Sequence, residues 1–261
     1  MTTDTPHALL EIDTVTKSFG GLQAVRNCSL QVRQGTITGL IGPNGAGKTT
    51  LFNLISGFYA PDAGSIVFQG KRIDGLPPHR VFRHGLCRTF QVPKELKQMT
   101  VLENLMLVPS GQTGEWLGAA WLMPWRVRQQ EQEAYDKALS VLEFVNLAHQ
   151  RNEYAANLST GQKKLLELAR AMMTDPQLIM LDEPGAGVNP TLLRSLMEQI
   201  ERLVAERGIT VLLIEHNMAV VMGLCNPVIV MSNGEKLAEG TPAEVQENEQ
   251  VLAAYLGGQN R

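Results

Sequence analysis

The chain has 261 residues, of which 44% are hydrophobic and 19% are charged, a composition typical of a globular protein with a substantial core. Lysine and arginine number 23 against 26 aspartate and glutamate residues, so the net charge is −3 and no positive excess favours nucleic acid as a partner. The first residues show no basic-then-apolar run and no stretch reaches the roughly 20 apolar residues of a membrane span, so we expect neither a signal peptide nor a transmembrane helix.

Strand and helix patterns alternate along most of the chain. Alternating or continuous apolar runs predict strands at 9–15, 23–33, 36–41, 65–68, 178–181, 211–214 and 228–231. Apolar spacing and end signals predict helices at 48–56, 126–147, 161–174 and 190–207, and a last helix that starts from a capping box at Thr241 and ends near Leu256.

This order predicts an α/β fold in which a mostly parallel sheet has helices on both faces. Residues 92–157 differ from the rest, since they show helical periodicity and no convincing strand. We therefore expect an α/β core made of 1–91 and 158–240, an inserted helical subdomain at 92–157, and a C-terminal helix and tail at 241–261.

A glycine-rich turn follows the strand predicted at 36–41. Residues 42–49 read GPNGAGKT and fit the P-loop pattern G-x-x-x-x-G-K-[ST] between a strand and a helix. Its glycines let backbone N–H groups surround phosphate oxygens, Lys48 adds a positive charge near the β and γ phosphates, and Thr49 offers a hydroxyl to Mg²⁺. In this context, a chance glycine-rich turn is the less favoured interpretation.

The segment LIMLDEP, residues 178–184, brings two carboxylates to the end of an apolar strand. Asp182 could hold Mg²⁺ through its waters, and the adjacent Glu183 could orient or deprotonate the attacking water. An acidic pair after a strand is by itself more often a solvated turn. Beside a P-loop, the catalytic interpretation is favoured.

A P-loop with an acidic strand end does not distinguish kinases, GTPases and transporter ATPases, but a third motif does. In LSTGQ, residues 158–162, Ser159 and Gln162 have the spacing of an ordinary capping box. At this place before the acidic strand end, LSTGQ also resembles the signature sequence of ABC ATPases. The chain is similar to that family over nearly its whole length, which implies the P-loop NTPase (RecA-like) fold with N-terminal antiparallel β strands.

Three further residues acquire roles from this resemblance. Phe19 in KSFGG resembles the aromatic that stacks on adenine, Gln91 in RTFQ resembles the glutamine that meets both Mg²⁺ and the membrane subunit, and His216 resembles the histidine that contacts the γ-phosphate. The resemblance thus implies ATP and Mg²⁺ as ligands, with catalytic residues Glu183, His216 and Gln91, metal ligands Thr49, Gln91 and Asp182, and ATP-binding residues Phe19, Gly42, Pro43, Asn44, Gly45, Ala46, Gly47, Lys48, Thr49, Thr50, Ser159, Thr160, Gly161 and Gln162.

In the family, the signature loop acts on the nucleotide that the P-loop of a second subunit holds. The resemblance therefore implies a second nucleotide-binding subunit, either another copy of this chain or a paralogue, with two ATP molecules between the two subunits. ATP binding would close this pair and hydrolysis would reopen it, which drives the transmembrane subunits.

Two positions depart from the usual family pattern. Thr160 stands where the signature usually has glycine, so we expect an ordinary backbone conformation there, with the Gly161 amide as the main donor. Asn189 stands where aspartate is usual; it should still cap the helix that starts at Pro190, but a negative charge near the dimer interface is lost.

Within the family, GPNGAGKTTLFNLISGF, RTFQ, MTVLENLM, AGVNP and AYLGG most resemble the LivG-type subunits of branched-chain amino-acid importers. This implies a peripheral protein at the cytoplasmic face of the cell membrane, working with two permease subunits and, indirectly, a periplasmic or extracellular solute-binding protein. Relatives in urea or amide uptake and in lipopolysaccharide export remain alternatives. A soluble ABC protein acting on nucleic acid is less favoured, because a second motif set and a basic linker are absent, and no N-K-x-D motif supports a GTPase.

The tryptophans Trp116, Trp121 and Trp125 gather in the segment GEWLGAAWLMPW. They could form a small core of their own within the helical subdomain. Alternatively, they could form an apolar surface that docks on the transmembrane partner, which is our hypothesis. The cysteines Cys28, Cys87 and Cys225 match no metal-ligand spacing, and their odd, sparse number suits a reducing compartment.

Overall fold

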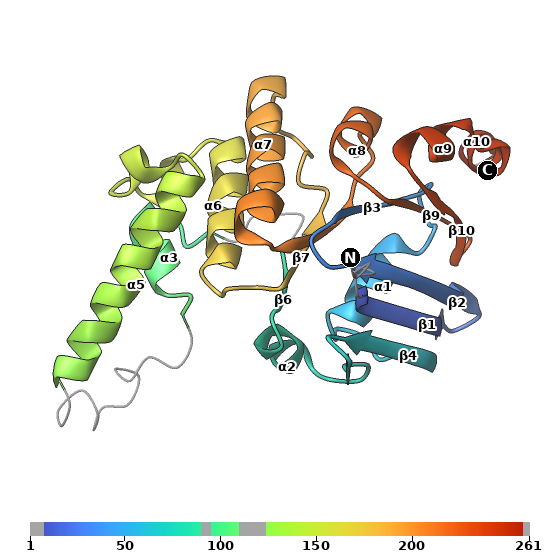
Figure 1. The fold of residues 1–261 in the computed structure, drawn as a ribbon, viewed down its shortest axis with the longest axis horizontal. Coiled ribbons are helices and arrows are strands. Elements are labelled where there is room, and N and C mark those ends of the chain that lie inside the picture. Colours follow the sequence, from blue (N-terminus) through green and yellow to red (C-terminus); the bar gives the residue numbers. More distant parts are fainter. Residues whose placement is uncertain (1–7, 90–94, 110–123, 258–261) are drawn as a thin grey trace, which may run out of the picture. The chain divides into compact units, whose positions relative to one another are not determined.

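The computed structural model describes residues 8–89, 95–109 and 124–257, and these divide into two compact units (Figure 1). The sheet unit comprises the described residues of Met1–Arg88, Gln177–Gly185 and Ile200–Arg261, and the helical unit those of Thr89–Pro176 and Ala186–Gln199. The helical unit thus also takes in 158–176 and 186–199, outside the segment expected at 92–157. The expected domain boundaries remain a prediction.

Four antiparallel strands at the start of the chain form the first sheet of the sheet unit. Their order is β2-β1-β4-β5, made of β1 (Ala8–Phe19), β2 (Leu22–Arg33), β4 (Ala63–Phe68) and β5 (Lys71–Arg72). The expected N-terminal antiparallel strands are confirmed. β1 is longer than the strand expected at 9–15, because it continues to pair with β2, through several register shifts, as far as Phe19 opposite Leu22.

The second sheet has six strands in the order β10-β9-β3-β8-β7-β6. They are β3 (Ile37–Ile41), β6 (Leu86–Arg88), β7 (Leu178–Asp182), β8 (Thr210–Ile214), β9 (Val228–Ser232) and β10 (Glu235–Gly240). All but β10 run parallel to their neighbours, which confirms the mostly parallel sheet. The carboxyl ends of these parallel strands therefore meet at one edge, where open α/β sheets bind ligands.

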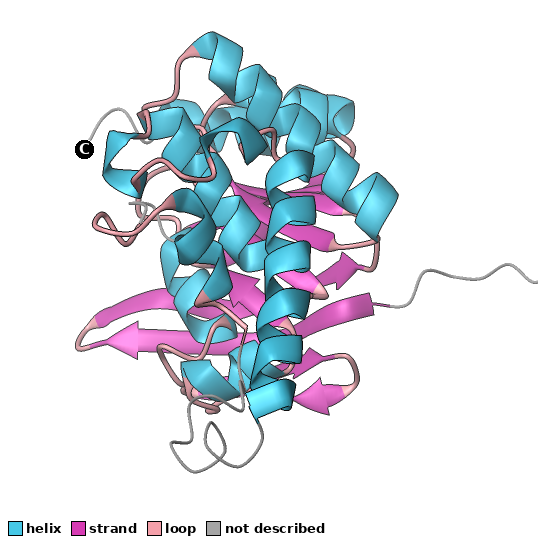
Figure 2. Ribbon diagram, turned by 90° about the vertical axis from the view of Figure 1, so that its left-hand side faces the viewer, coloured by secondary structure: helices cyan, strands magenta, loops and turns pink. Residues whose placement is uncertain are grey.

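One hydrophobic core joins the two sheets of this unit. Figure 2 shows the strands as two separate groups, and the buried side chains of both groups pack with those of α1 (Lys48–Ile55). From α1 the core includes Leu51, Phe52, Leu54 and Ile55. On the other side of the six-stranded sheet lie α8 (Met218–Leu224) and α9 (Pro242–Glu247) (Figure 1), and α2 (Pro78–Arg83) completes the core through Val81. This packing fixes α1, and with it the P-loop, against the sheet.

The helical unit contains α3 (Val101–Met106), α5 (Pro124–Phe144) and α6 (Thr160–Met172), with 3₁₀ turns η2 (Ala148–Gln150) and η3 (Ala155–Asn157). The helix α7 (Pro190–Arg207) begins in this unit and ends in the sheet unit. The expected apolar face of the long helix is confirmed, because Ala134, Ala138, Leu142 and Val145 are all buried.

The C-terminal helix expected from Thr241 to about Leu256 is wrong as a single element. The structure has α9, which starts from the expected capping box, and a separate α10 (Glu249–Gly257). Asn248 separates them because its backbone is extended and its Oδ1 accepts from the N–H groups of Gln250 at 2.9 Å and Val251 at 3.3 Å. The short strands β5, β6 and β10 and the short helices α2, α3 and α8 were not predicted, since their few residues carry no clear periodicity.

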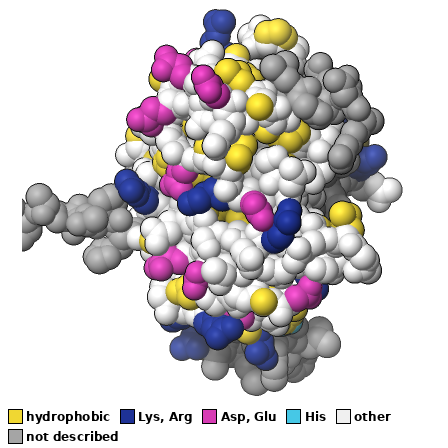
Figure 3. Space-filling model, turned by 90° about the vertical axis from the view of Figure 1, so that its right-hand side faces the viewer, with side chains coloured by type: hydrophobic (Ala, Val, Ile, Leu, Met, Phe, Trp, Pro, Cys, Tyr) yellow, Lys and Arg dark blue, Asp and Glu magenta, His cyan; other side chains and the backbone are white. Residues whose placement is uncertain are grey.

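No helix within the described ranges is long and apolar enough to cross a membrane. On the face seen in Figure 3, basic and acidic side chains are interspersed, with apolar side chains scattered among them. The mixture agrees with the near balance of 23 basic and 26 acidic residues in the sequence.

Candidate functional site

The loop between β3 and α1 requires glycine at two of its positions. Gly42 has a φ of 149° and Gly47 a φ of 100°. A Cβ atom on Gly42 would lie 2.1 Å from the Met231 carbonyl oxygen, and one on Gly47 would lie 2.4 Å from that of Ala24. The loop therefore packs against backbone carbonyls that cannot move aside, which fixes the curled backbone expected of a phosphate-binding loop.

Lys48 points its ammonium group into this loop. Its Nζ donates to the carbonyl oxygens of Gly42 at 2.7 Å and Pro43 at 3.0 Å, and the residue is 6% exposed. Burial lowers the pKa of Lys48, while the negative charges of Glu183 and Asp182 oppose that shift. A positive charge thus sits among loop carbonyls, near two carboxylates and with little solvent, where an anionic phosphate would gain strongly from contact with it.

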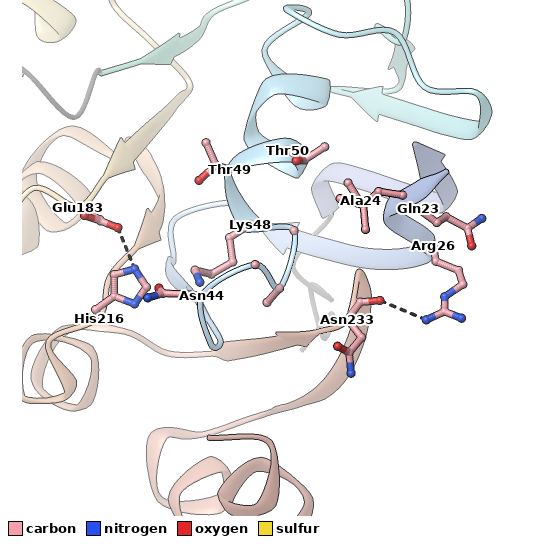
Figure 4. A pocket seen from close by; sticks show the side chains of 14 residues that line it. Gln23, Ala24, Arg26, Asn44, Lys48, Thr49, Thr50, Glu183, His216 and Asn233 are labelled. Carbon is pink, nitrogen blue, oxygen red and sulfur yellow. Dashed lines mark hydrogen bonds and ion pairs between the residues drawn. The ribbon is translucent and has the colours of Figure 1, made fainter. Parts of the chain in front are cut away.

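A cavity of about 680 Å³ opens over the loop (Figure 4). This volume lies in the range of small-molecule sites. Its described lining comes from the P-loop, from the residues after β7 and β8, from the start of β2 and from the turn after β9, namely Asn44, Gly45, Ala46, Gly47, Lys48, Thr49, Thr50, Glu183, His216, Leu22, Gln23, Ala24, Arg26 and Asn233. The P-loop residues Asn44 to Thr50 therefore share one cavity with Glu183 and His216, two of the three residues expected to be catalytic.

Glu183 and His216 contact each other across this cavity (Figure 4). Oε1 of Glu183 lies 2.8 Å from Nε2 of His216. The Glu183 N–H donates to the carbonyl of Ile214 at 2.9 Å, so the ends of β7 and β8 are joined by backbone as well. Glu183 has a φ of +49°, a strained conformation for a residue with a side chain and one that is concentrated at functional sites.

Asp182 ends β7 and pairs with Arg88 at the end of the parallel neighbour β6. Arg88 Nη2 donates to Asp182 Oδ2 at 2.9 Å, with only 10% and 9% of the two side chains exposed. The same guanidinium donates to Asn53 Oδ1 at 2.6 Å and Ser56 Oγ at 3.3 Å, both in or next to α1. Arg88 therefore ties Asp182 to the helix that carries Thr49.

A carboxylate that binds backbone amides follows β8. Glu215 is 4% exposed, and its Oε1 accepts from the N–H of Gly185 at 2.8 Å. Its Oε2 accepts from the N–H groups of His216 at 2.9 Å and Asn217 at 3.1 Å. Glu215 thus joins the loop after β7 to the loop after β8.

The expected signature residues open α6 in the helical unit. Ser159 and Gln162 form the predicted capping box, with the Ser159 N–H donating to Gln162 Oε1 at 2.9 Å. Thr160 is the first residue of the helix and is not among the described residues with positive φ, so its predicted ordinary backbone is confirmed. Asn189 also caps α7 as predicted, because its Oδ1 accepts from the Leu192 N–H at 2.9 Å.

Other predicted residues are placed differently or cannot be placed. Phe19 is 42% exposed, packs edge-on against Tyr59 with 5.2 Å between ring centroids, and is not among the described residues that line the cavity. Gln91, Trp116 and Trp121 lie outside the described residues, while Trp125 lies at the start of α5 and is 64% exposed. Gly42, Pro43 and Asp182 lie beside the cavity lining rather than in it.

Sequence reasoning missed two groups of residues at this site. Arg88 and Glu215 end or follow parallel strands, so the argument about the carboxyl edge that selected Asp182 could have found them. Arg26, Asn233 and the residues at the start of β2 line the cavity from distant parts of the chain, and no local pattern marks them.

The sequence matches the ABC transporter family over residues 25–186, which include the P-loop, the signature and the acidic strand end. The chain belongs to the ABC transporter family. It is therefore an ATP-binding cassette with ATPase activity, and it binds nucleotide. Residues 235–259 of this cassette also match the family of branched-chain amino acid ATP-binding cassette transporters.

Curated relatives resemble this ABC cassette over almost their whole length. A probable branched-chain amino acid transport ATP-binding protein LivG from Archaeoglobus fulgidus is 42% identical over 97% of this chain and 96% of its own. High-affinity branched-chain amino acid transport ATP-binding proteins from Salmonella typhimurium (LivG) and Pseudomonas aeruginosa (BraF) are each 43% identical, over 95% of this chain and 98% of theirs. The resemblance to LivG-type subunits is thus confirmed.

Solved structures of ABC transporter cassettes share the fold. A nucleotide-free ATP-binding cassette superposes with a TM-score of 0.82 at 37% identity, covering 95% of this chain and 98% of its own. A cassette in its ADP conformation gives a TM-score of 0.82 at 38% identity, with 96% and 99% covered. These matches confirm the P-loop NTPase fold class.

Proposed function

We propose that this ABC cassette hydrolyses ATP to energise the uptake of branched-chain amino acids. The observation that carries the proposal is the cavity in which the P-loop lysine, Glu183 and His216 meet. The full-length similarity to subunits named for branched-chain amino acid transport, and the match of residues 235–259 to that subgroup, support this solute class over the urea, amide and lipopolysaccharide alternatives.

In this proposal, the P-loop residues Asn44 to Thr50 bind the phosphates of ATP, with N–H groups from the loop and the ammonium of Lys48. Gly42 and Pro43 position that ammonium through their carbonyl groups. The ribose and the base would occupy the part of the cavity beyond the loop. This part is lined by Leu22, Gln23, Ala24, Arg26 and Asn233. Phe19 lies just before this stretch of β2 and would reach the base from its edge.

The oxygen atoms near the P-loop suit a magnesium ion. Thr49 lines the cavity with a hydroxyl and Asp182 presents a carboxylate, and hard oxygen ligands are those that Mg²⁺ prefers. Among the described residues, no three His, Cys, Asp or Glu side chains are grouped to hold a metal by themselves. Thr49, Asp182 and Gln91 would therefore hold Mg²⁺ together with the phosphates, and the ion would neutralise charge on them.

Glu183 is the proposed base that orients the attacking water, and His216 is its proposed partner on the γ-phosphate side. The 2.8 Å contact between them would keep the carboxylate of Glu183 turned toward the cavity. The left-handed backbone at Glu183 supports this role, because such strain persists only where surrounding contacts hold it.

Ser159, Thr160, Gly161 and Gln162 are proposed to bind the ATP held by a second copy of this chain or by a paralogue. Their placement at the start of α6 supports this, since a helix N-terminus presents N–H groups to an anion. The Ser159 hydroxyl now accepts from the Gln162 N–H at 3.3 Å and remains free to donate its own proton.

Two permease subunits are the proposed membrane partners, with a periplasmic or extracellular solute-binding protein delivering the solute to them. The cassette would then lie at the cytoplasmic face of the cell membrane, attached through these partners. The segment with Trp116, Trp121 and Trp125, together with Gln91, is the proposed docking region. The exposed indole of Trp125 supports a role on the surface.

Uptake measurements in cells that lack the gene for this chain test the proposal. We expect uptake of labelled leucine, isoleucine and valine to be lost, and to return with the wild-type gene but not with Lys48→Ala. Uptake of labelled urea and of a short-chain amide is measured in parallel. If branched-chain uptake were normal and urea or amide uptake were lost, the solute would be urea or an amide instead.

A further inference from the structure

Glu215 is a buried carboxylate that precedes His216 in the chain and bonds to the loop after Glu183. It follows β8 and is not among the described residues that line the cavity. Its side chain is only 4% exposed. Because burying a charge is costly unless it is hydrogen-bonded, its backbone contacts must account for its position.

Three backbone N–H groups donate to this carboxylate. Gly185 donates to Oε1 at 2.8 Å, and His216 and Asn217 donate to Oε2 at 2.9 and 3.1 Å. An ionised carboxylate only accepts, so it matches three donors, whereas the isosteric amide of glutamine would turn its NH₂ group toward one of them. The geometry therefore selects a carboxylate at this position over a neutral side chain of the same shape.

Two of these contacts are local and one is not. The bonds from His216 and Asn217 shape the turn that follows Glu215, and Asn217 then caps α8. The bond from Gly185 instead crosses between the ends of two neighbouring strands. Only Pro184 separates Gly185 from Glu183, and its ring restricts the backbone between them.

This crossing bond helps to hold Glu183 in its strained backbone conformation. A left-handed residue with a side chain costs roughly 1 to 3 kcal/mol and needs surrounding contacts that hold it. On one side of Glu183, its own N–H donates to Ile214, and on the other side Gly185 is held by Glu215. Both contacts end on the segment that leads to His216.

We infer that Glu215 is a positioning residue that fixes Glu183 and His216 at bonding distance. This inference rests on the roles proposed above for Glu183 and His216. Without the carboxylate, the loop at Gly185 is released, Glu183 relaxes from its left-handed conformation, and the 2.8 Å contact with His216 opens. The P-loop and Lys48 do not depend on Glu215, so nucleotide binding persists while turnover falls.

Two substitutions test the carboxylate, and one of them tests the crossing bond by itself. Glu215→Gln keeps the shape and removes the acceptor-only group. Glu215→Asp is shorter by one methylene, so it can still accept from Asn217 in an Asx turn but cannot reach Gly185. In both variants, we expect kcat for ATP hydrolysis to fall by about 100-fold, the scale of a misplacement near 1 Å, with the Kd for ADP within threefold.

Glu244→Gln is the matched control. Its carboxylate also accepts from a backbone N–H, that of Thr241 at 2.7 Å, but in an exposed capping box at α9. This variant should hydrolyse ATP at the wild-type rate. Wild-type kcat in Glu215→Asp would overturn the inference, because it would show that the crossing bond is dispensable.

Two measurements keep the inference testable apart from the proposed function. Hydrogen exchange of the wild-type protein should show the Gly185 amide strongly protected, and an amide exchanging at the rate of an unfolded peptide would overturn the inference even if no Glu215 variant folds. A crystal structure of Glu215→Asp should place Glu183 Oε1 and His216 Nε2 beyond hydrogen-bond distance. A wild-type protein that did not hydrolyse ATP would contradict the proposed function. Both measurements would still test whether Glu215 holds Gly185 and the contact between Glu183 and His216.

Discussion

Oε1 of Glu183 lies 2.8 Å from Nε2 of His216, although the two residues follow different strands of the parallel sheet. The register of β7 and β8, which pairs Asp182 with Ile214, brings them together. Each is therefore placed by a strand that is buried along its whole length rather than by a free loop. Such rigid placement is what a group that must orient a water molecule requires.

Glu183→Gln should retain nucleotide binding and nearly eliminate hydrolysis. The amide keeps the size of the side chain but loses the basicity needed to orient or deprotonate water. Because ATP would then persist, we expect an ATP-dependent dimer in size-exclusion chromatography. Turnover by the Gln variant at the wild-type rate would show that Glu183 is not the base.

Lys48→Ala should weaken ATP binding by at least about 10-fold, as expected from the loss of one charge-assisted hydrogen bond to phosphate. The ammonium lies inside the loop on the carbonyls of Gly42 and Pro43, so the substitution removes the positive charge from the loop itself. Titration with a fluorescent ATP analogue measures the effect. Lys71→Ala, a lysine exposed on β5, is the control and should bind like wild type.

Arg88→Met should destabilise the protein by about 3 kcal/mol or more. It leaves Asp182 buried without its ion-pair partner, and breaking one side of a buried pair is costly. Arg72→Met removes a pair of the same 2.9 Å length whose arginine is exposed, and should cost less than about 1 kcal/mol. Urea unfolding of both variants measures the difference, and equal losses would contradict the structural role of Arg88.

Gly47→Ala and Gly45→Ala should differ strongly, although both glycines have positive φ, 100° and 79°. A Cβ on Gly47 would overlap the Ala24 carbonyl at 2.4 Å, while one on Gly45 meets nothing within 4 Å. We expect a loss of about 1 kcal/mol in the free energy of unfolding for Gly45→Ala, from the left-handed backbone alone. For Gly47→Ala we expect at least about 3 kcal/mol, since a backbone clash must be relieved. Similar losses in urea unfolding would argue against this packing.

Stability should fall at alkaline pH. Burial raises the pKa of Cys28 to about 11 and that of Cys225 to about 12, from 9.0. Below pH 9 both thiols are neutral in either state, whereas between pH 9 and 11 the unfolded chain releases protons that the folded chain retains. The unfolding equilibrium constant should then rise by up to about tenfold per pH unit for each thiol. Urea unfolding in reductant measures this rise, and Cys225→Ala should remove one thiol's share.

The local features of this protein could be predicted from its sequence because they depend on neighbouring residues. The curled P-loop needs glycine where φ is positive, and the motif GPNGAGKT predicts this loop. The capping boxes at Ser159 and Thr241 need only a residue three positions on, and both were predicted correctly. The prediction of a single C-terminal helix was wrong. The Asn248 side chain competes with the helical backbone for an N–H group, and the periodicity of the sequence does not indicate this break.

The order of the strands, by contrast, was decided only by the tertiary structure. The sequence shows that Lys48, Asp182, Glu183 and His216 each follow a strand, but not that β3, β8 and β7 are neighbours. That neighbourhood lets Glu183 contact His216, Arg88 neutralise Asp182 and Glu215 bind Gly185. Strand pairing depends on burial against the rest of the core, so contacts between residues far apart in the chain appear only once the sheet has formed.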